Sequence, residues 1–341
     1  MQIEKKDTFS NDILIIDGLW GSGKSLLAPI ISGMRNVEKV KIESIYEYIS
    51  WLSRLKKVDN DAAIWMLRSY ADMSQYHNVI GREVNLRWSD DSGLKFAVDK
   101  FKLIQRLFCS EGDDRVSEIN NKNLSLCIMS HMLMLAPELL IPAFGSRIKV
   151  IEMVRHPLYM VEHFKNYLKR FESSREFTIS FYSDGVKVPW FAVGWEYDFV
   201  HASPLERAVL CIQKLYLSLF QELSISKAYG LAVLDVSFEQ MVFDTDAVLL
   251  KLESFTGRPH HKSINSLLKK QKIPRESIAA GRGHSSYGWV KGRLSEEDAY
   301  RNHIKIVKTG CNANLFQDFN NLIVRYNDLY PSKLKRFEGI I

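Results

Sequence analysis

The sequence contains few cysteines. Its 341 residues include only four, Cys109, Cys127, Cys211 and Cys311. No two of them stand at C-x-x-C spacing, and their density is too low for a disulfide framework. We therefore expect four buried free thiols in a reducing compartment.

Long apolar runs and a secretory leader are also missing. No uninterrupted apolar stretch reaches the roughly 18 residues that indicate a membrane-spanning helix. The segment Met1–Phe9 is polar and lacks the apolar centre of a signal peptide. These features predict a cytoplasmic protein with no membrane span.

Neither sign of charge dominates. The chain has 46 Lys and Arg residues against 40 Asp and Glu residues, which gives a net charge of +6. This mild excess suits an anionic ligand, but no compact basic run indicates a nucleic-acid surface. We expect no nucleic-acid partner, and the sequence leaves the oligomeric state open.

Apolar, β-branched runs predict buried strands. These runs cover residues 13–17, 124–130, 147–154 and 231–236. Helical patterns cover residues 24–34, 159–171, 205–223, 246–255 and the tail from Ser295. Apolar strands separated by helices predict an α/β fold with a central, mainly parallel sheet flanked by helices.

The domain organisation follows from the same pattern. We expect a single domain over residues 1–341, because no repeat or low-complexity segment divides the chain. Residues 45–120 look helical and predict an insertion. A second segment, residues 172–203, carries turn residues and alternation and predicts a hairpin or insertion on the acceptor side.

The most specific motif follows the first predicted strand. Gly18-Leu19-Trp20-Gly21-Ser22-Gly23-Lys24-Ser25 matches G-x-x-x-x-G-K-[ST], the complete phosphate-loop (Walker A) pattern. Its glycines let backbone N–H groups turn toward a phosphate, and the helix N-terminus adds its positive dipole end. A tight turn with an exposed lysine is the alternative, but the strand and helix on either side favour phosphate binding.

The motif assigns a role to each of its polar residues. The predicted nucleotide-binding residues are Gly18, Gly21, Ser22, Gly23, Lys24 and Ser25. We expect Lys24 to reach the reacting end of the nucleotide and Ser25 to contact a phosphate oxygen or a metal.

Arg155 directly follows the third predicted strand. The carboxyl end of a buried strand faces the ligand crevice of an open α/β sheet. A guanidinium there can bind a phosphate with two hydrogen bonds, although a strand-end salt bridge fits this segment equally well.

Several segments resemble those of the sulfotransferase family in order and spacing. Residues 148–164 resemble the segment that binds the 3′-phosphate, in which a strand ends in R-x-P and a helix follows. Met129-Ser130-His131-Met132-Leu133 resembles the family's K-T-H-L segment, and residues 237–242 resemble its F-E-D-L segment. Gly281-Arg282-Gly283 resembles the late loop that closes over the donor.

This resemblance implies a P-loop sulfotransferase. Such an enzyme would bind 3′-phosphoadenosine 5′-phosphosulfate and pass its sulfuryl group to a hydroxyl or amine of an acceptor, for example a glycan. The sequence does not name that acceptor. Arg155 would hold the 3′-phosphate, with Arg282 and Gly283 touching the same group. His163 stands where the family usually has a serine.

The resemblance also gives His131 the position of the catalytic histidine. A hydroxyl acceptor must lose its proton as it attacks, and a histidine with an unperturbed pKa near 6.5 can take that proton. Charge that develops on the transferred group would be stabilised by Lys24.

Two departures keep other functions open. Gly21 stands where many sulfotransferases carry Lys or Arg, and Met129 replaces the family's lysine. An ATP-dependent phosphotransferase with magnesium therefore remains an alternative, and Asp235 at the end of the fourth strand would be its metal-holding carboxylate. That aspartate is also typical of a plain strand end or helix cap. A nucleotide-binding protein without catalysis is the third possibility, and no metal site is assigned.

Overall fold

A parallel sheet forms the centre of the protein. The computed structural model describes residues 3–88, 90, 92–97, 99–171, 178–278 and 295–340. Five strands lie in the order β2-β3-β1-β4-β7, and every neighbouring pair is parallel. The strands are β1 Ile13–Asp17, β2 Lys41–Ile42, β3 Leu126–Met129, β4 Ile148–Val154 and β7 Ala232–Ser237. The predicted α/β class is confirmed.

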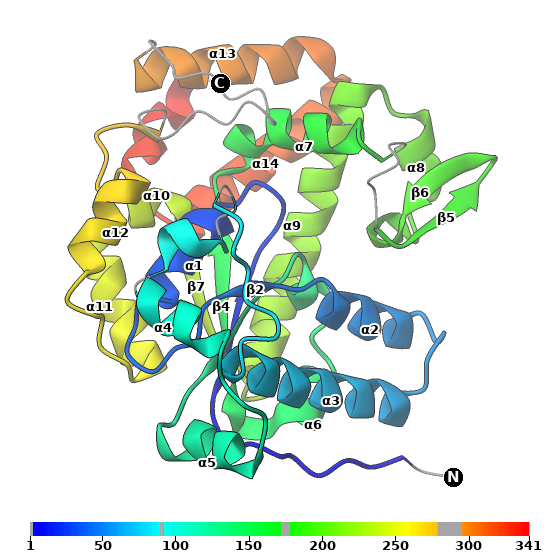
Figure 1. Cartoon of the computed structure of the whole chain (residues 1–341). Helices are drawn as coiled ribbons and strands as arrows, with labels where there is room; N and C mark the ends of the chain where they lie inside the picture. The colour runs from blue at the N-terminus through cyan, green and yellow to red at the C-terminus, as the bar shows by residue number, and fades with distance from the viewer. Residues whose placement is uncertain are drawn as a thin grey trace.

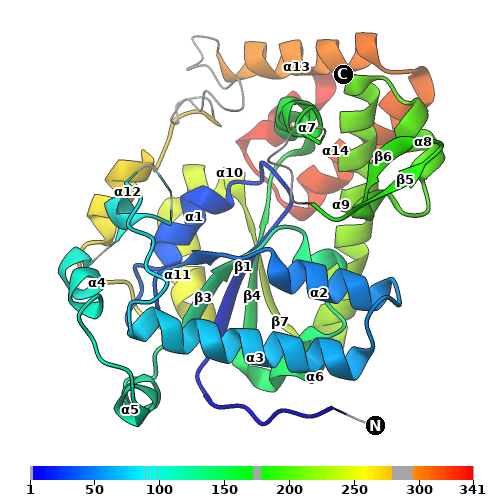
Figure 2. The same ribbon diagram turned by 45° about the vertical axis from the view of Figure 1, so that its right-hand side comes forward.

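The central strands are buried on both faces. Every residue of β1 and β3 is buried, as expected for strands that helices cover on both sides. Helices α1, α11 and α12 lie on one side of the sheet, and α3, α6 and α9 lie on the other (Figures 1 and 2). The carboxyl ends of the parallel strands meet at one edge, where a ligand site of such a sheet is expected.

The helices vary in length from five to 25 residues. Those of the first half are α1 Lys24–Ile31, α2 Ile45–Arg54, α3 Asn60–Val79, α4 Lys100–Arg106, α5 Asp113–Asn121, α6 Leu140–Phe144 and α7 Val161–Leu168. Those of the second half are α8 Glu196–His201, α9 Pro204–Ala228, α10 Phe238–Phe243, α11 Thr245–Thr256, α12 Ile264–Gln271, α13 Glu296–Gly310 and α14 Ala313–Leu329. Short 3-10 helices cover Leu94–Phe96, Leu133–Leu135, Gly145–Arg147, Pro157–Met160, Trp190–Ala192 and Lys333–Ile340.

A small antiparallel hairpin projects beside α8 (Figure 1). It consists of β5 Ser180–Ser183 and β6 Val186–Pro189, joined by a turn in which Asp184 and Gly185 both have positive φ. The alternation expected over residues 172–203 therefore corresponds to a hairpin in its described part, which begins at residue 178.

Two local features differ from the sequence-based expectations. The helix expected from residue 159 begins at Val161, because Pro157–Met160 forms a 3-10 turn ahead of it. β2 was not predicted, because a strand of two residues shows no periodicity.

The long helix α9 is the core helix of the second half. It is the one helix in the described part of the chain that is long and apolar enough to cross a membrane. However, 61% of its most apolar window is buried against the rest of the fold. Its apolar composition is therefore accounted for by packing.

All four cysteines are free thiols, as expected. Cys127 and Cys211 are buried, and burial raises the pKa of the Cys127 thiol to about 12. Cys109 and Cys311 are only half-buried, so the expectation that all four lie in the core was wrong. Both lie beyond the ends of helices, α4 and α13, where the chain is less covered.

Candidate functional site

The loop between β1 and α1 has a backbone that only glycine accommodates. Gly18, Gly21 and Gly23 have φ values of +146°, +83° and +107°. A Cβ atom on Gly18 would lie 2.3 Å from the Met153 carbonyl oxygen, and one on Gly23 would lie 2.4 Å from the Phe238 ring. The glycines of the motif are therefore required by both conformation and close packing.

Two side chains from other elements converge on the middle of this loop. Arg155, directly after β4, donates from Nη1 to the Gly21 carbonyl at 3.0 Å, and its guanidinium lies 4.3 Å from the Phe238 ring centroid. His163, on α7, packs so closely that a Cβ on Gly21 would lie 2.8 Å from its Cγ. The structure thus brings together three residues that the sequence assigned to one nucleotide site.

The backbone of Arg155 is also fixed in place. The Tyr216 hydroxyl, on α9, accepts a hydrogen bond from the Arg155 N–H at 3.0 Å and donates to the Arg155 carbonyl. Arg155 itself is buried, and burial lowers the pKa of its guanidinium, an effect that Glu239 opposes. A guanidinium remains protonated in spite of such a shift, so this residue carries a fixed positive charge.

Lys24 begins α1 and turns back under the loop. Its Nζ donates to the carbonyl of Gly18 and, at 3.0 Å, to that of Leu19. The residue is only 5% exposed, unlike the exposed lysine of a plain turn. Burial lowers the pKa of the ammonium group, and nearby carboxylates oppose that shift.

Those carboxylates are Asp17, Glu152 and Glu47. Asp17 on β1 lies directly opposite Glu152 on β4 in the ladder. Burial, together with the charge of Asp17, raises the pKa of both Glu47 and Glu152 well above the ordinary range. Neither carboxylate oxygen of Glu152 has a hydrogen-bond partner within the described residues, so no hydrogen bond offsets the cost of burying its charged form.

Two of these acids hold the segment that follows β3. Asp17 accepts hydrogen bonds from the Ser130 hydroxyl at 2.9 Å and from the Met134 N–H at 2.7 Å. Glu47, on α2, accepts one from the His131 N–H at 2.7 Å. His131 is therefore anchored at the carboxyl end of the sheet by its backbone.

The His131 side chain is half-buried close to the loop lysine. Burial, with smaller contributions from Lys24 and His163, lowers the pKa of its imidazole to about 3. The ring is therefore neutral at physiological pH and can accept a proton, but it is a weaker base than an exposed histidine.

The remaining predicted residues fall in three groups. Ser22 is buried, and its hydroxyl has no hydrogen-bond partner among the described residues, whereas Ser25 is exposed on the first turn of α1. Arg282 and Gly283 lie outside the described residues. Asp235 pairs with the Lys227 ammonium group and accepts a hydrogen bond from the Tyr330 hydroxyl at 3.0 Å.

The sequence did not single out several residues that the structure places at this site. Asp17 had a visible signal, because it ends β1 and directly precedes the motif. Glu47 had none, because its approach depends on how α2 packs. Phe238 lies in the segment that resembles the family's F-E-D-L, but its contact with the loop depends on how α10 packs. Arg275 had no signal, and its guanidinium lies 5.6 Å from the Phe238 ring centroid.

Comparison with known proteins adds little to this geometry. No protein-family model and no curated protein matches the sequence. The crystal structure of a sulfotransferase from Mycobacterium avium is similar, with a TM-score of 0.41 and 11% sequence identity over 95% of this chain and 78% of that chain. At that score the similarity carries no functional argument, so the function is argued from the residues of the site.

Proposed function

We propose that the protein is a sulfotransferase that moves the sulfuryl group of 3′-phosphoadenosine 5′-phosphosulfate to a hydroxyl or amine of an acceptor. The observation that carries this proposal is the convergence of Arg155 and His163 on Gly21 in the β1–α1 loop. A cation placed beside a phosphate loop, on a different strand, suits a donor that carries a second, separate phosphate.

The proposed donor site divides between two anionic groups. Residues 18–25 would surround the 5′-phosphosulfate with backbone N–H groups at the start of α1. Arg155 and His163 would bind the 3′-phosphate, and the sequence resemblance adds Arg282 and Gly283. Lys24 would have to leave the carbonyls of Gly18 and Leu19 to reach the donor.

In the proposed reaction the acceptor oxygen forms a bond to sulfur as the bond from sulfur to the 5′-phosphate oxygen breaks. The acceptor proton passes to the neutral imidazole of His131, and adenosine 3′,5′-bisphosphate leaves with the bonding electrons. Negative charge grows on the departing oxygen, where the ammonium group of Lys24 would stabilise it. Glu47 is the alternative base, because its raised pKa and its position beside His131 and Lys24 also suit proton transfer.

An ATP-dependent phosphotransferase is the second candidate. It is favoured by the place of Lys24 in a complete G-K-S motif, which is typical of nucleoside-triphosphate enzymes. The carboxylate of Asp235, which that function would use for magnesium, is already paired with Lys227 and Tyr330. A nucleotide-binding protein without catalysis is the third candidate, and it would bind the donor without transfer.

The test of the proposal is a transfer assay with sulfur-labelled donor and a broad set of hydroxyl and amine acceptors. We expect Lys24→Ala to slow transfer by about 100- to 1,000-fold, the usual loss for one preorganised donor. The matched control is Lys122→Ala, directly after α5. The Lys122 side chain is 57% exposed, so this substitution should leave the rate unchanged. Transfer by Lys24→Ala at the parental rate would refute the role of the loop.

A further inference from the structure

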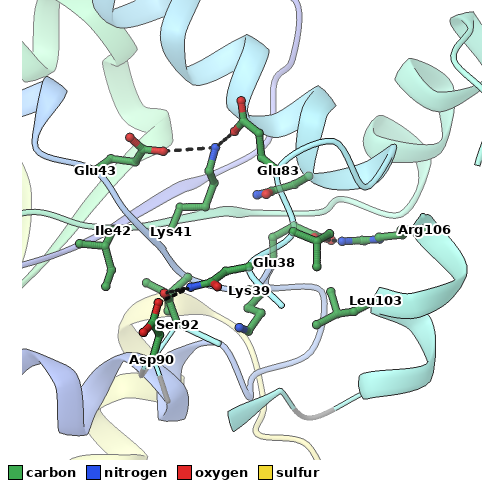
Figure 3. A pocket seen from close by; sticks show the side chains of 14 residues that line it. Glu38, Lys39, Lys41, Ile42, Glu43, Glu83, Asp90, Ser92, Leu103 and Arg106 are labelled. Atoms are coloured by element: carbon green, nitrogen blue, oxygen red, sulfur yellow. Dashed lines mark hydrogen bonds and ion pairs between the residues drawn. The ribbon is translucent and has the colours of Figure 1, made fainter. Parts of the chain in front are cut away.

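A cavity of about 380 Å³ lies at the β2 edge of the sheet, and none of the proposed donor-binding residues lines it in the described part of the chain. Its described wall is built from residues 38–43, Asn78 of α3, residues 83–85, Asp90, Ser92 and two residues of α4 (Figure 3). This volume lies within the range of small-molecule sites in proteins. The cavity is therefore large enough to hold a ligand of its own.

Most charged side chains around the cavity already have partners. The guanidinium of Arg106 binds both carboxylate oxygens of Glu38, one of them at 2.8 Å (Figure 3). The ammonium group of Lys41 pairs with Glu83 and, at 3.3 Å, with Glu43. These groups shape the wall and are already engaged with one another.

Two donors in the wall have no partner among the described residues. They are the buried Nζ of Lys39 and the Nδ2 of Asn78, a residue that is only 7% exposed. Burial lowers the pKa of Lys39 to about 8, with Asp90 opposing the shift, so this group is still largely protonated at pH 7. Leaving a buried donor unsatisfied costs about 1–3 kcal/mol, which a ligand acceptor would recover.

We propose that this cavity binds a small monocarboxylate with a hydrocarbon body. Its carboxylate would accept hydrogen bonds from the Nζ of Lys39 and the Nδ2 of Asn78, and such charge-assisted bonds are the stronger kind. Apolar side chains of the wall would contact its body, and they are Val40, Ile42, Val84 and Leu103.

The charge of the wall limits the ligand to one negative charge. Among the described residues, four acidic ones line the cavity, Glu38, Glu43, Glu83 and Asp90, against three basic ones, Lys39, Lys41 and Arg106. The excess of one carboxylate would repel a second negative charge on the ligand. Phosphates and dicarboxylates should therefore bind less well than a monocarboxylate.

The test is a calorimetric titration of the full chain with hexanoate at pH 7. Hexanamide has the same shape without the charge, and succinate adds a second charge. We expect saturable binding of hexanoate and at least tenfold weaker binding of the other two, since each tenfold is about 1.4 kcal/mol. No saturable binding of hexanoate, or equal binding of all three, would overturn the proposal.

Substitutions locate the binding in the cavity. Lys39→Met and Asn78→Leu should each weaken hexanoate binding at least tenfold, while the Lys122→Met variant, changed directly after α5, should bind it like the parent. Lys39→Met should also raise the melting temperature, because it removes a buried ammonium group that has no hydrogen-bond partner among the described residues. If Lys39 were needed only for folding, Lys39→Met would lower the melting temperature. Undiminished hexanoate binding by a folded Lys39→Met protein would refute the site.

Discussion

His131 and Glu47 are the two candidates for the base in the proposed reaction. They are linked by the hydrogen bond from the His131 N–H to the Glu47 carboxylate, and their pKa values are shifted in opposite directions. The imidazole is kept neutral, and burial raises the pKa of the Glu47 carboxyl well above its ordinary value. Either group could take the acceptor proton.

We predict that His131→Ala lowers the transfer rate by about 100- to 10,000-fold, the usual scale for lost acid–base catalysis, with donor affinity nearly unchanged. Because the pKa of His131 is lowered to about 3, its imidazole stays neutral as the pH falls, and the transfer rate of the parent protein should persist well below pH 6.5. The measurement is kcat against pH for the parent, for His131→Ala and for Glu47→Gln. A rate that is normal in His131→Ala and lost in Glu47→Gln would transfer the role to the glutamate.

At the scale of elements, the β1–α1 loop is packed against side chains from the end of β4, from α7 and from α10. Arg155, His163 and Phe238 each contact it, from those three parts of the chain. The shape of the loop therefore depends on tertiary packing as well as on its own glycines.

We predict that Gly23→Ala destabilises the protein by about 1–3 kcal/mol more than Gly185→Ala does, the usual cost of overpacking. Both glycines have positive φ, so both substitutions strain the backbone. Only at Gly23 would the new methyl group meet an atom, the Phe238 ring at 2.4 Å, whereas nothing lies within 4 Å at Gly185. Urea unfolding measures the difference in stability. Equal losses of stability in the two variants would show that the loop shifts to accommodate the new methyl group at Gly23.

The sequence predicted the elements unevenly, for physical reasons. Strands β1, β3 and β4 were predictable, because burial on both faces leaves a continuous apolar run. β7 is only partly buried, and it was predictable from the apolar run of residues 231–234. The meeting of Gly21 and Arg155 was predictable from a motif and from parallel strand ends, whereas His163 was assigned to the same site only by the resemblance to the sulfotransferase family. The positions of Glu47 and Phe238 were not, because they depend on how α2 and α10 pack against distant segments.

At the scale of the whole molecule, buried histidines should set the acid limit of stability. Burial lowers the pKa of His156 to about 3, and its Nε2 has no hydrogen-bond partner in the described part of the chain. Between pH 6.5 and about 3, the His156 imidazole is protonated in the unfolded chain but not in the folded chain. Stability is therefore lost as the pH falls through this window.

We predict that His156→Asn reduces this acid sensitivity. Asparagine does not titrate and can still accept the hydrogen bond from the Leu158 N–H that His156 now receives. The slope of unfolding free energy against pH, measured between pH 6 and 4.5, should fall by up to about 1.4 kcal/mol per pH unit, the effect of one proton. Identical slopes in parent and variant would show that His156 does not resist protonation.

The central claim is that the β1–α1 loop and Arg155 together bind a nucleotide with a 3′-phosphate. The most direct measurement is a calorimetric titration of the full chain with adenosine 3′,5′-bisphosphate and with ATP, each with and without magnesium. We predict at least tenfold tighter binding of the bisphosphate, with no need for magnesium. Arg155→Ala should remove about 1.5–3 kcal/mol of that preference, the scale of a charged hydrogen bond. Tighter binding of ATP that requires magnesium, with no effect of the 3′-phosphate, would contradict the sulfotransferase proposal and favour the phosphotransferase.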